Sequence, residues 1–98
     1  MKEVIKPMVR TLATGTNLIA KEMSGKKDKF LPKHSANIES VIFIHVGECI
    51  LSINDEEIMM KPGDTFVIPP HIKHQFVGIT DFKGIHIMPK EIEFEFFN

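Results

Sequence analysis

The sequence predicts an all-β domain, built as an antiparallel sandwich or barrel. Short runs of β-branched and aromatic residues recur along the chain, and turn residues separate them at close intervals. No helical periodicity extends beyond about one turn, so nothing could supply the crossover helices of a parallel sheet. Because the chain has only 98 residues, we expect one domain spanning residues 1–98.

The first half of the chain contains two predicted strands. Thr16–Met23 is extended and ends at a charged turn, residues 24–29. The lysines of this turn form a basic cluster with Lys33, which we interpret as a solvated loop, with an anion-collecting rim as the alternative. Val41–Val46 is apolar except at His45, and we expect a central strand that is buried on both faces.

The second half reads as a meander followed by an amphipathic tail. Five short strands are bounded by turn residues: Cys49–Ile53, Ile58–Lys61, Thr65–Ile68, His74–Gly78 and Ile85–Met88. In the tail, Ile92, Phe94 and Phe96 alternate with glutamates, which predicts a strand with one dry and one wet face. A core this small would be enlarged by pairing, so we expect a homodimer to which the terminal strands contribute.

The composition excludes several functions. Twelve Lys and Arg against 13 Asp and Glu give a formal charge of −1, so we expect no nucleic-acid partner. The longest apolar run is far shorter than the roughly 20 residues that cross a bilayer, so we expect no membrane partner. Cys49 stands alone and the start lacks a secretory signal, both of which favour the cytoplasm.

Two stretches share their spacing with the motifs of a known family. In the first, Gly47 follows Ser40 by seven residues, and in the second His71 stands where a glycine is usual. They resemble the cupin motifs H-x-H-x3-E-x6-G and G-D-x4-P-x-G-x2-H over roughly residues 30–90. The resemblance implies a double-stranded β-helix, a jelly-roll-like barrel that is commonly paired into homodimers. The residues in register are His34, Gly47, Gly63, Asp64, Pro69 and His74.

The resemblance also implies a metal site in the barrel mouth, where histidines and a glutamate hold a transition metal. His34 and His74 match the first and last ligands, but Ala36 and Ser40 replace the second histidine and the glutamate. Alanine has no donor atom and a serine hydroxyl is a poor ligand. Since such sites normally draw on at least three protein ligands, we expect binding of Fe, Mn, Ni, Cu or Zn to be weak or absent.

Other residues could complete or shape the site. A β-bulge could turn Glu39 inward, and His86 could approach from a later strand, so each is a candidate third ligand. His71 could lean over the mouth, whereas His45 is expected outside the cavity or at a subunit contact. The residues expected to line the pocket are His34, Ala36, Ser40, Ile42, Phe66, His74 and Phe76.

The function expected from these residues is binding of a small organic molecule in the barrel mouth, with His34, Ser40 and His74 as polar handles. The catalytic residues, if the protein is an enzyme, are unknown. The alternative is a metal-dependent oxygenase or isomerase with a reconstituted histidine site, or a metal-free isomerase that uses an imidazole as general base. A third interpretation is docking of the amphipathic tail, residues 91–97, on another protein.

Overall fold

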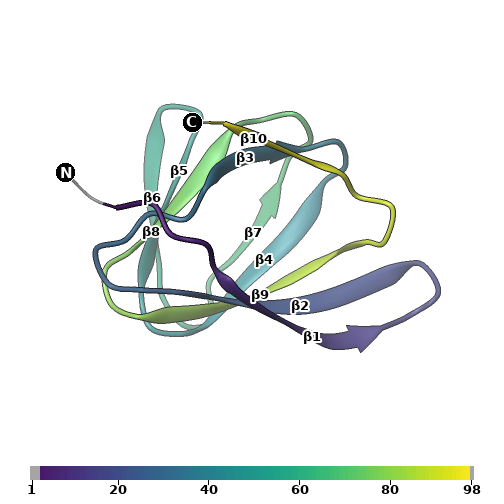
Figure 1. Cartoon of the computed structure of the whole chain (residues 1–98), viewed down its shortest axis with the longest axis horizontal. Coiled ribbons are helices and arrows are strands. Elements are labelled where there is room, and N and C mark those ends of the chain that lie inside the picture. Colours follow the sequence, from purple (N-terminus) through teal and green to yellow (C-terminus); the bar gives the residue numbers. More distant parts are fainter. Residues whose placement is uncertain (1–2, 98) are drawn as a thin grey trace.

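Ten β-strands and their connecting turns make up the computed structural model, which describes residues 3–97 (Figure 1). This part of the chain has no helix long and apolar enough to cross a membrane. The prediction of an all-β domain is confirmed. The strands are β1 Met8–Thr14, β2 Leu18–Gly25, β3 Lys33–Ala36, β4 Ser40–Val46, β5 Cys49–Ile53, β6 Glu56–Met60, β7 Thr65–Ile68, β8 His74–Gly78, β9 Phe82–Pro89 and β10 Phe94–Phe97.

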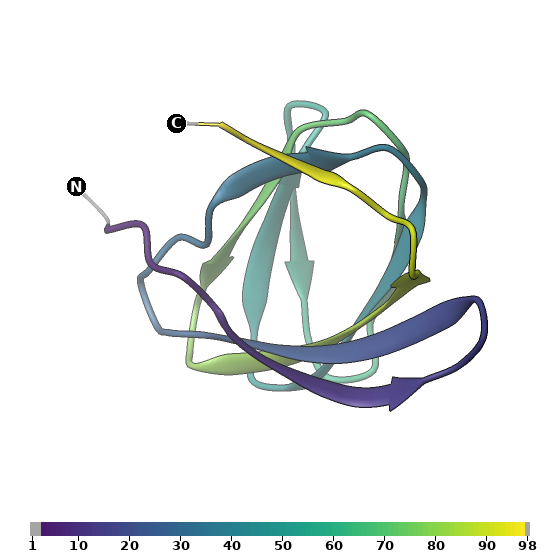
Figure 2. The same ribbon diagram turned by 45° about the vertical axis from the view of Figure 1, so that its right-hand side comes forward.

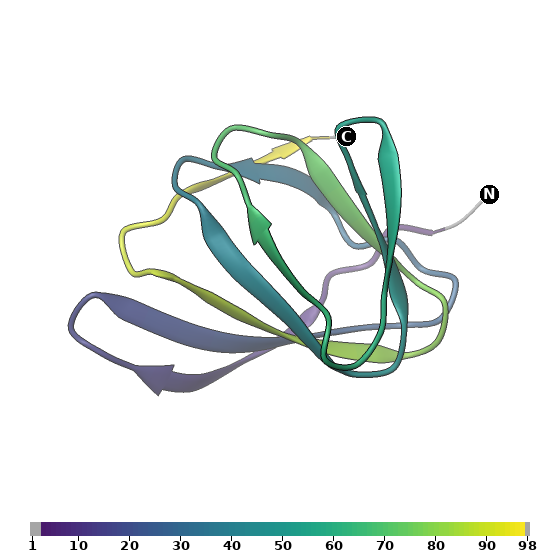
Figure 3. The ribbon, with the colours of Figure 1, turned by 180° about the vertical axis from the view of Figure 1, so that it is seen from behind.

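The strands form two five-stranded antiparallel sheets, in the orders β1-β2-β9-β4-β7 and β10-β3-β8-β5-β6. Figure 2 shows the sheets wrapped around a common interior, with the β1–β2 hairpin reaching beyond it. Seen from behind in Figure 3, β4 and β7 of one sheet lie opposite β5 and β6 of the other. Most neighbouring strands are therefore distant in sequence, and each sheet has one inner and one outer face.

The hydrophobic core fills the space between the sheets. On β4 and β5, alternate residues point inward, and Ile44 and Leu51 have no exposed surface. Phe76 of β8 and Phe82 of β9 pack in the same cluster. The prediction that Val41–Val46 is buried on both faces is wrong, because no third layer covers the outer face of β4, where the side chains are only half-buried.

Strand ends differ from the predictions where pairing or a turn decides them. β9 is longer than Ile85–Met88 because β2 pairs with all of it, from Leu18 opposite Pro89 to Gly25 opposite Phe82. β10 is shorter than the predicted tail strand because the Ile92 amide donates to the Pro89 carbonyl in the preceding turn, at 3.2 Å. The sequence pattern predicts no strand at β1 or β3, because apolar and polar residues alternate less clearly there.

The tail strand is an edge strand and not a half-buried one. β10 pairs only with β3, and its Phe94 and Phe96 side chains are 38% and 64% exposed. The predicted dry face is therefore wrong, because these rings face an open cavity instead of the core. β1, at the edge of the other sheet, is exposed along its whole length. Formation of a homodimer stays a prediction.

Two glycines in turns give the first testable prediction. Gly47 and Gly63 both have positive φ, 73° and 95°. A Cβ at Gly47 would overlap the carbonyl oxygen of Asp81, whereas a Cβ at Gly63 would meet nothing within 4 Å. We expect Gly63→Ala to lower the free energy of unfolding by about 1 kcal/mol, the conformational cost alone. Gly47→Ala should cost about 3 kcal/mol or more, because the backbone must also move.

Urea unfolding of the two variants beside the parent protein measures the difference. Each variant adds the same methyl group at the same sign of φ, so each serves as the control for the other. Equal losses in the two variants would show that the contact between Gly47 and Asp81 is not as tight as the structure has it.

Candidate ligand-binding site

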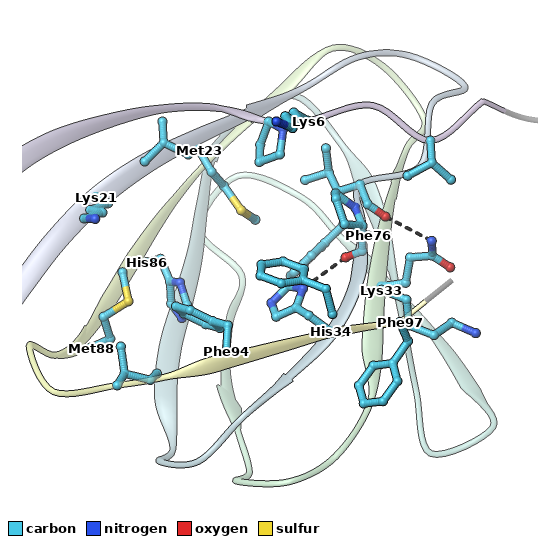
Figure 4. Close-up of a pocket in the computed structure, with 18 of the residues that line it drawn as sticks. Lys6, Lys21, Met23, Lys33, His34, Phe76, His86, Met88, Phe94 and Phe97 are labelled. Atoms are coloured by element: carbon cyan, nitrogen blue, oxygen red, sulfur yellow. Dashed lines mark hydrogen bonds between the residues drawn. The ribbon is translucent and has the colours of Figure 1, made fainter.

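A cavity of about 1150 Å³ opens between β2 and β9 on one side and β3, β8 and β10 on the other (Figure 4). Residues 4–9, which precede and begin β1, complete its wall. The wall is mostly apolar. On β2 it is lined by alternate residues, Ile19, Lys21 and Met23, whose side chains share one face of the strand. Other apolar wall residues are Phe76, Met88, Phe94 and Phe96.

His34 and His74 stand opposite each other on β3 and β8, and their ring centroids are 4.4 Å apart in an edge-on contact. Nδ1 of His34 donates to the Pro32 carbonyl at 3.0 Å, and Nδ1 of His74 donates to the Ile72 carbonyl at 2.9 Å. In both rings the carbonyl two residues earlier therefore fixes the proton on Nδ1. Each Nε2 is left as a hydrogen-bond acceptor.

His86 is held by a different partner. It lies on β9 beside β4, and its Nε2 is 2.7 Å from the Ser40 hydroxyl. Figure 4 shows His34, His86 and Phe94 together on the wall, and the Phe94 ring lies between the two imidazoles, with its centroid 5.4 Å from that of His34 and 6.1 Å from that of His86. The serine thus occupies a hydrogen-bonding site of one histidine.

Burial keeps all three imidazoles neutral at pH 7. It lowers the pKa of His34 below its usual 6.5, against the opposing effect of the Pro32 carbonyl. Burial lowers the pKa of His74 and of His86 to about 4. The charge that a neighbouring histidine would carry is a smaller part of each shift, and for His86 the charge of Lys21 also contributes. The cluster therefore carries no positive charge, and Nε2 of His34 and of His74 are its acceptor nitrogens.

The residues expected to line the pocket are found in several places. His34 and Phe76 lie on the cavity wall. His74 contacts His34 but is only 3% exposed, and it does not reach the wall. Ala36 is buried and borders a smaller hollow that also involves Asn37 and His71.

Ser40, Ile42 and Phe66 do not line the large cavity. Ile42 belongs to the core between the sheets, and Phe66 packs against it, because the inner face of β4 and β7 points at the opposite sheet and not at the mouth. Ser40 is buried and reaches the site only through His86. His45 lies away from the cavity, with Nε2 3.1 Å from a Glu22 carboxylate oxygen.

The donor set does not fit a transition-metal site in this arrangement. Glu39 is exposed in the turn before β4, whose pairing with β7 starts in regular register at Ser40, so no bulge turns it inward. Nε2 of His86 is engaged by Ser40. Across residues 3–97, no three His, Cys, Asp or Glu side chains are grouped so that they could hold a metal ion.

Sequence reasoning missed a set of cavity residues that only the fold brings together. The segment containing Val4, Pro7 and Val9 lies at the mouth because Val4 bridges to Phe30, which has no local signature. Lys21 was within reach of prediction, since it has the same strand parity as Ile19 and Met23.

The chain belongs to the cupin family, because the model of the cupin domain (Cupin_2) matches residues 23–88. This confirms the resemblance of the two motifs. No curated protein sequence matches the chain.

Solved structures share the cupin fold over most of the chain. A conserved protein of unknown function from Streptococcus pyogenes has a TM-score of 0.74 at 23% identity, over 89% of this chain and 80% of its own. The polyketide cyclase RemF from Streptomyces resistomycificus has a TM-score of 0.84 at 19% identity, over 95% and 72%. A variant of the salicylate 1,2-dioxygenase from Pseudoaminobacter salicylatoxidans has a TM-score of 0.82 at 11% identity, over 92% and 30%. At these identities the likeness shows the fold alone.

The buried histidines predict a loss of stability in mild acid. In the folded protein the pKa of His74 and of His86 is about 4, below the 6.5 of an unfolded chain. Between these values the unfolded state binds more protons. The stabilisation is therefore complete above pH 6.5 and is lost as the pH falls towards 4, by up to about 3 kcal/mol for each group. Urea unfolding at pH values from 7 to 4.5 measures this slope.

Two histidine variants separate the contribution of the buried histidines to this pH dependence from the contribution of the carboxylates. His86→Gln keeps a hydrogen-bonding group for Ser40 but removes one titrating ring, so its stability should fall less steeply with acid. His71→Asn removes an exposed histidine at a position of positive φ, which asparagine tolerates, and it serves as the control. Parallel curves for His86→Gln and the parent protein would contradict the prediction.

Proposed function

We propose that this protein binds a small organic molecule in the cavity between β2, β9 and β10, and that binding does not require a metal ion. The observation that carries the proposal is the cavity itself, which is large, mostly apolar and open to solvent at one end of the barrel. Its volume is close to the 300–1,000 Å³ of ordinary ligand pockets. A few polar groups set in an apolar wall are the usual means of orienting such a ligand.

The polar groups on the wall offer defined acceptors. His34 is neutral with its proton fixed on Nδ1, so Nε2 can accept a hydrogen bond from a ligand hydroxyl or amide. Gln75, also on the wall, donates its amide to the Leu31 carbonyl at 3.0 Å and so keeps its own oxygen as an acceptor. These groups would position a ligand whose apolar part rests on the Phe94 and Phe96 rings.

A second candidate function is metal-free isomerisation with His34 as general base. The observation that favours it is the state of this imidazole, which burial keeps neutral and whose proton the Pro32 carbonyl fixes on Nδ1, as a base facing a substrate requires. A metal-dependent oxygenase or isomerase is favoured less, because His86 would have to leave Ser40 before it could serve as a third ligand.

Removal of the exposed aromatic wall tests the proposal. Phe94 and Phe96 are part of an edge strand, so the double variant Phe94→Ser, Phe96→Ser should fold while losing apolar contact with any ligand. With Nile red as a neutral probe, we expect binding to the parent protein and at least fivefold weaker binding to the variant. Fluorescence titration measures both.

The matched control replaces two apolar residues of similar exposure elsewhere. Met59 and Val67 are 56% and 54% exposed and do not line the cavity, so Met59→Ser, Val67→Ser should keep the affinity of the parent. Equal weakening in the two double variants, or no binding to the parent, would contradict the proposal.

A metal titration tests the second half of the proposal. Excess Fe²⁺, Ni²⁺ or Zn²⁺ should leave the thermal midpoint unchanged, because tight binding to the native state alone would raise it. A saturable rise in the thermal midpoint that disappears in the His34→Ala, His74→Ala double variant would overturn the proposal that binding requires no metal ion. It would support the metal-dependent enzyme instead.

A further inference from the structure

The charged side chains on the cavity wall all have the same sign. Among residues 3–97, four lysines line the cavity, and they come from four separate segments: the stretch before β1, β2, β3 and the turn after β9. No Asp or Glu of residues 3–97 contributes to the wall. The four are Lys6, Lys21, Lys33 and Lys90.

None of these lysines is neutralised by a carboxylate within the described chain. The lysine ion pairs there are Lys26 with Asp81 and Lys29 with Glu3, both away from the cavity. Lys90 donates only to the Gly15 carbonyl, at 3.2 Å. The basic cluster predicted from the sequence, the lysines of residues 24–29 with Lys33, differs from the lysines of the cavity. Only Lys33 belongs to both groups. The rest of the cluster forms a solvated turn with its own partners.

We propose that the ligand is an amphipathic carboxylate, with an apolar body on the aromatic wall and its anionic group among these lysines. This inference rests on the proposed function and names the class of ligand. It does not follow from the overall charge, since the chain as a whole is slightly acidic at −1. The positive charge is concentrated at the cavity by the fold.

The lysines favour an anionic ligand over a neutral or cationic one, because every charged side chain on the described wall is positive. Figure 4 shows Lys6, Lys21 and Lys33 at different points around the wall, with His34 and Phe94 between them. Lys21 lies opposite His86 in the register of β2 and β9. Lysine ammonium groups act as point charges that can attract the carboxylate of a ligand whose apolar body rests on the aromatic wall.

The neutral histidines set the direction of the ligand. Because Nε2 of His34 is an acceptor, it would repel a carboxylate and attract a hydroxyl or amide hydrogen. The anionic end therefore turns away from the imidazoles and towards the lysine ammonium groups. An anion there also relieves the repulsion between the lysines, a gain that dissolved salt reduces.

A pair of probes that differ only in charge tests the inference. 1-Naphthoate and 1-naphthamide share an aromatic body, and we expect the anion to bind about tenfold more tightly at low salt. The preference should shrink in 0.5 M NaCl. In the Lys21→Gln, Lys33→Gln variant it should fall to about twofold or less, with little change in binding of the amide. Calorimetric titration measures each affinity.

The control variant is Lys26→Gln, Lys27→Gln, which removes the same charge from the turn outside the cavity. It should keep the full preference for the anion. Equal binding of the two probes, or a preference that the control variant also loses, would overturn the inference while binding of Nile red stands. Failure of Nile red and both naphthalene probes to bind would instead overturn the proposed function.

Discussion

The candidate site depends on how the two sheets pack, because each sheet contacts the other through one face only. Every strand must turn one parity of side chain inward, and along β4 and β5 that parity builds the core. Towards the mouth the sheets diverge, and β2, β9 and β10 present the corresponding side chains to an open cavity. The same alternation therefore produces a dry core at one end and an open cavity at the other. A one-residue slip in β9 would exchange His86 and Met88 for Ile85 and Ile87.

Two substitutions relative to the cupin motif change the chemistry of the mouth. A glutamate at position 40 would bring a negative charge against His86, whereas Ser40 gives a neutral hydrogen bond of 2.7 Å. Because Ala36 replaces the second histidine, His34 and His74 are the only histidines at the ligand positions of the two motifs. Without a nearby carboxylate, burial is free to lower the pKa of each ring. The result is a group of neutral imidazoles where the motif would assemble ligands for a cation.

The fold could be predicted from the sequence because the residues that indicate strands and turns lie close together in the chain. Turns at Asn54-Asp55 and Gly63 lie where positive φ occurs, and the two motifs are in register with the family. The cavity wall was harder to predict from the sequence. It is made of side chains from six segments, and the curvature of the sheets decides which of these segments come close together. The family motif predicted His34 and the apolar strand pattern predicted Phe76, both of which lie on the wall, but the same pattern also assigned Ile42 and Phe66 to the pocket. The position of a residue along a strand predicts which face of the sheet it occupies. It does not predict whether that part of the face packs in the core or lines the mouth of the barrel.

The wall is closed by segments from opposite ends of the chain. Residues 4–9 lie on one side of the cavity, and Phe94, Phe96 and Phe97 lie on the other. During synthesis the motifs and the core strands leave the ribosome before β10 does, so the barrel can form before its mouth has a complete wall. Without β10 the wall would lack three aromatic rings. The wall of the cavity therefore depends on segments that are far apart in sequence.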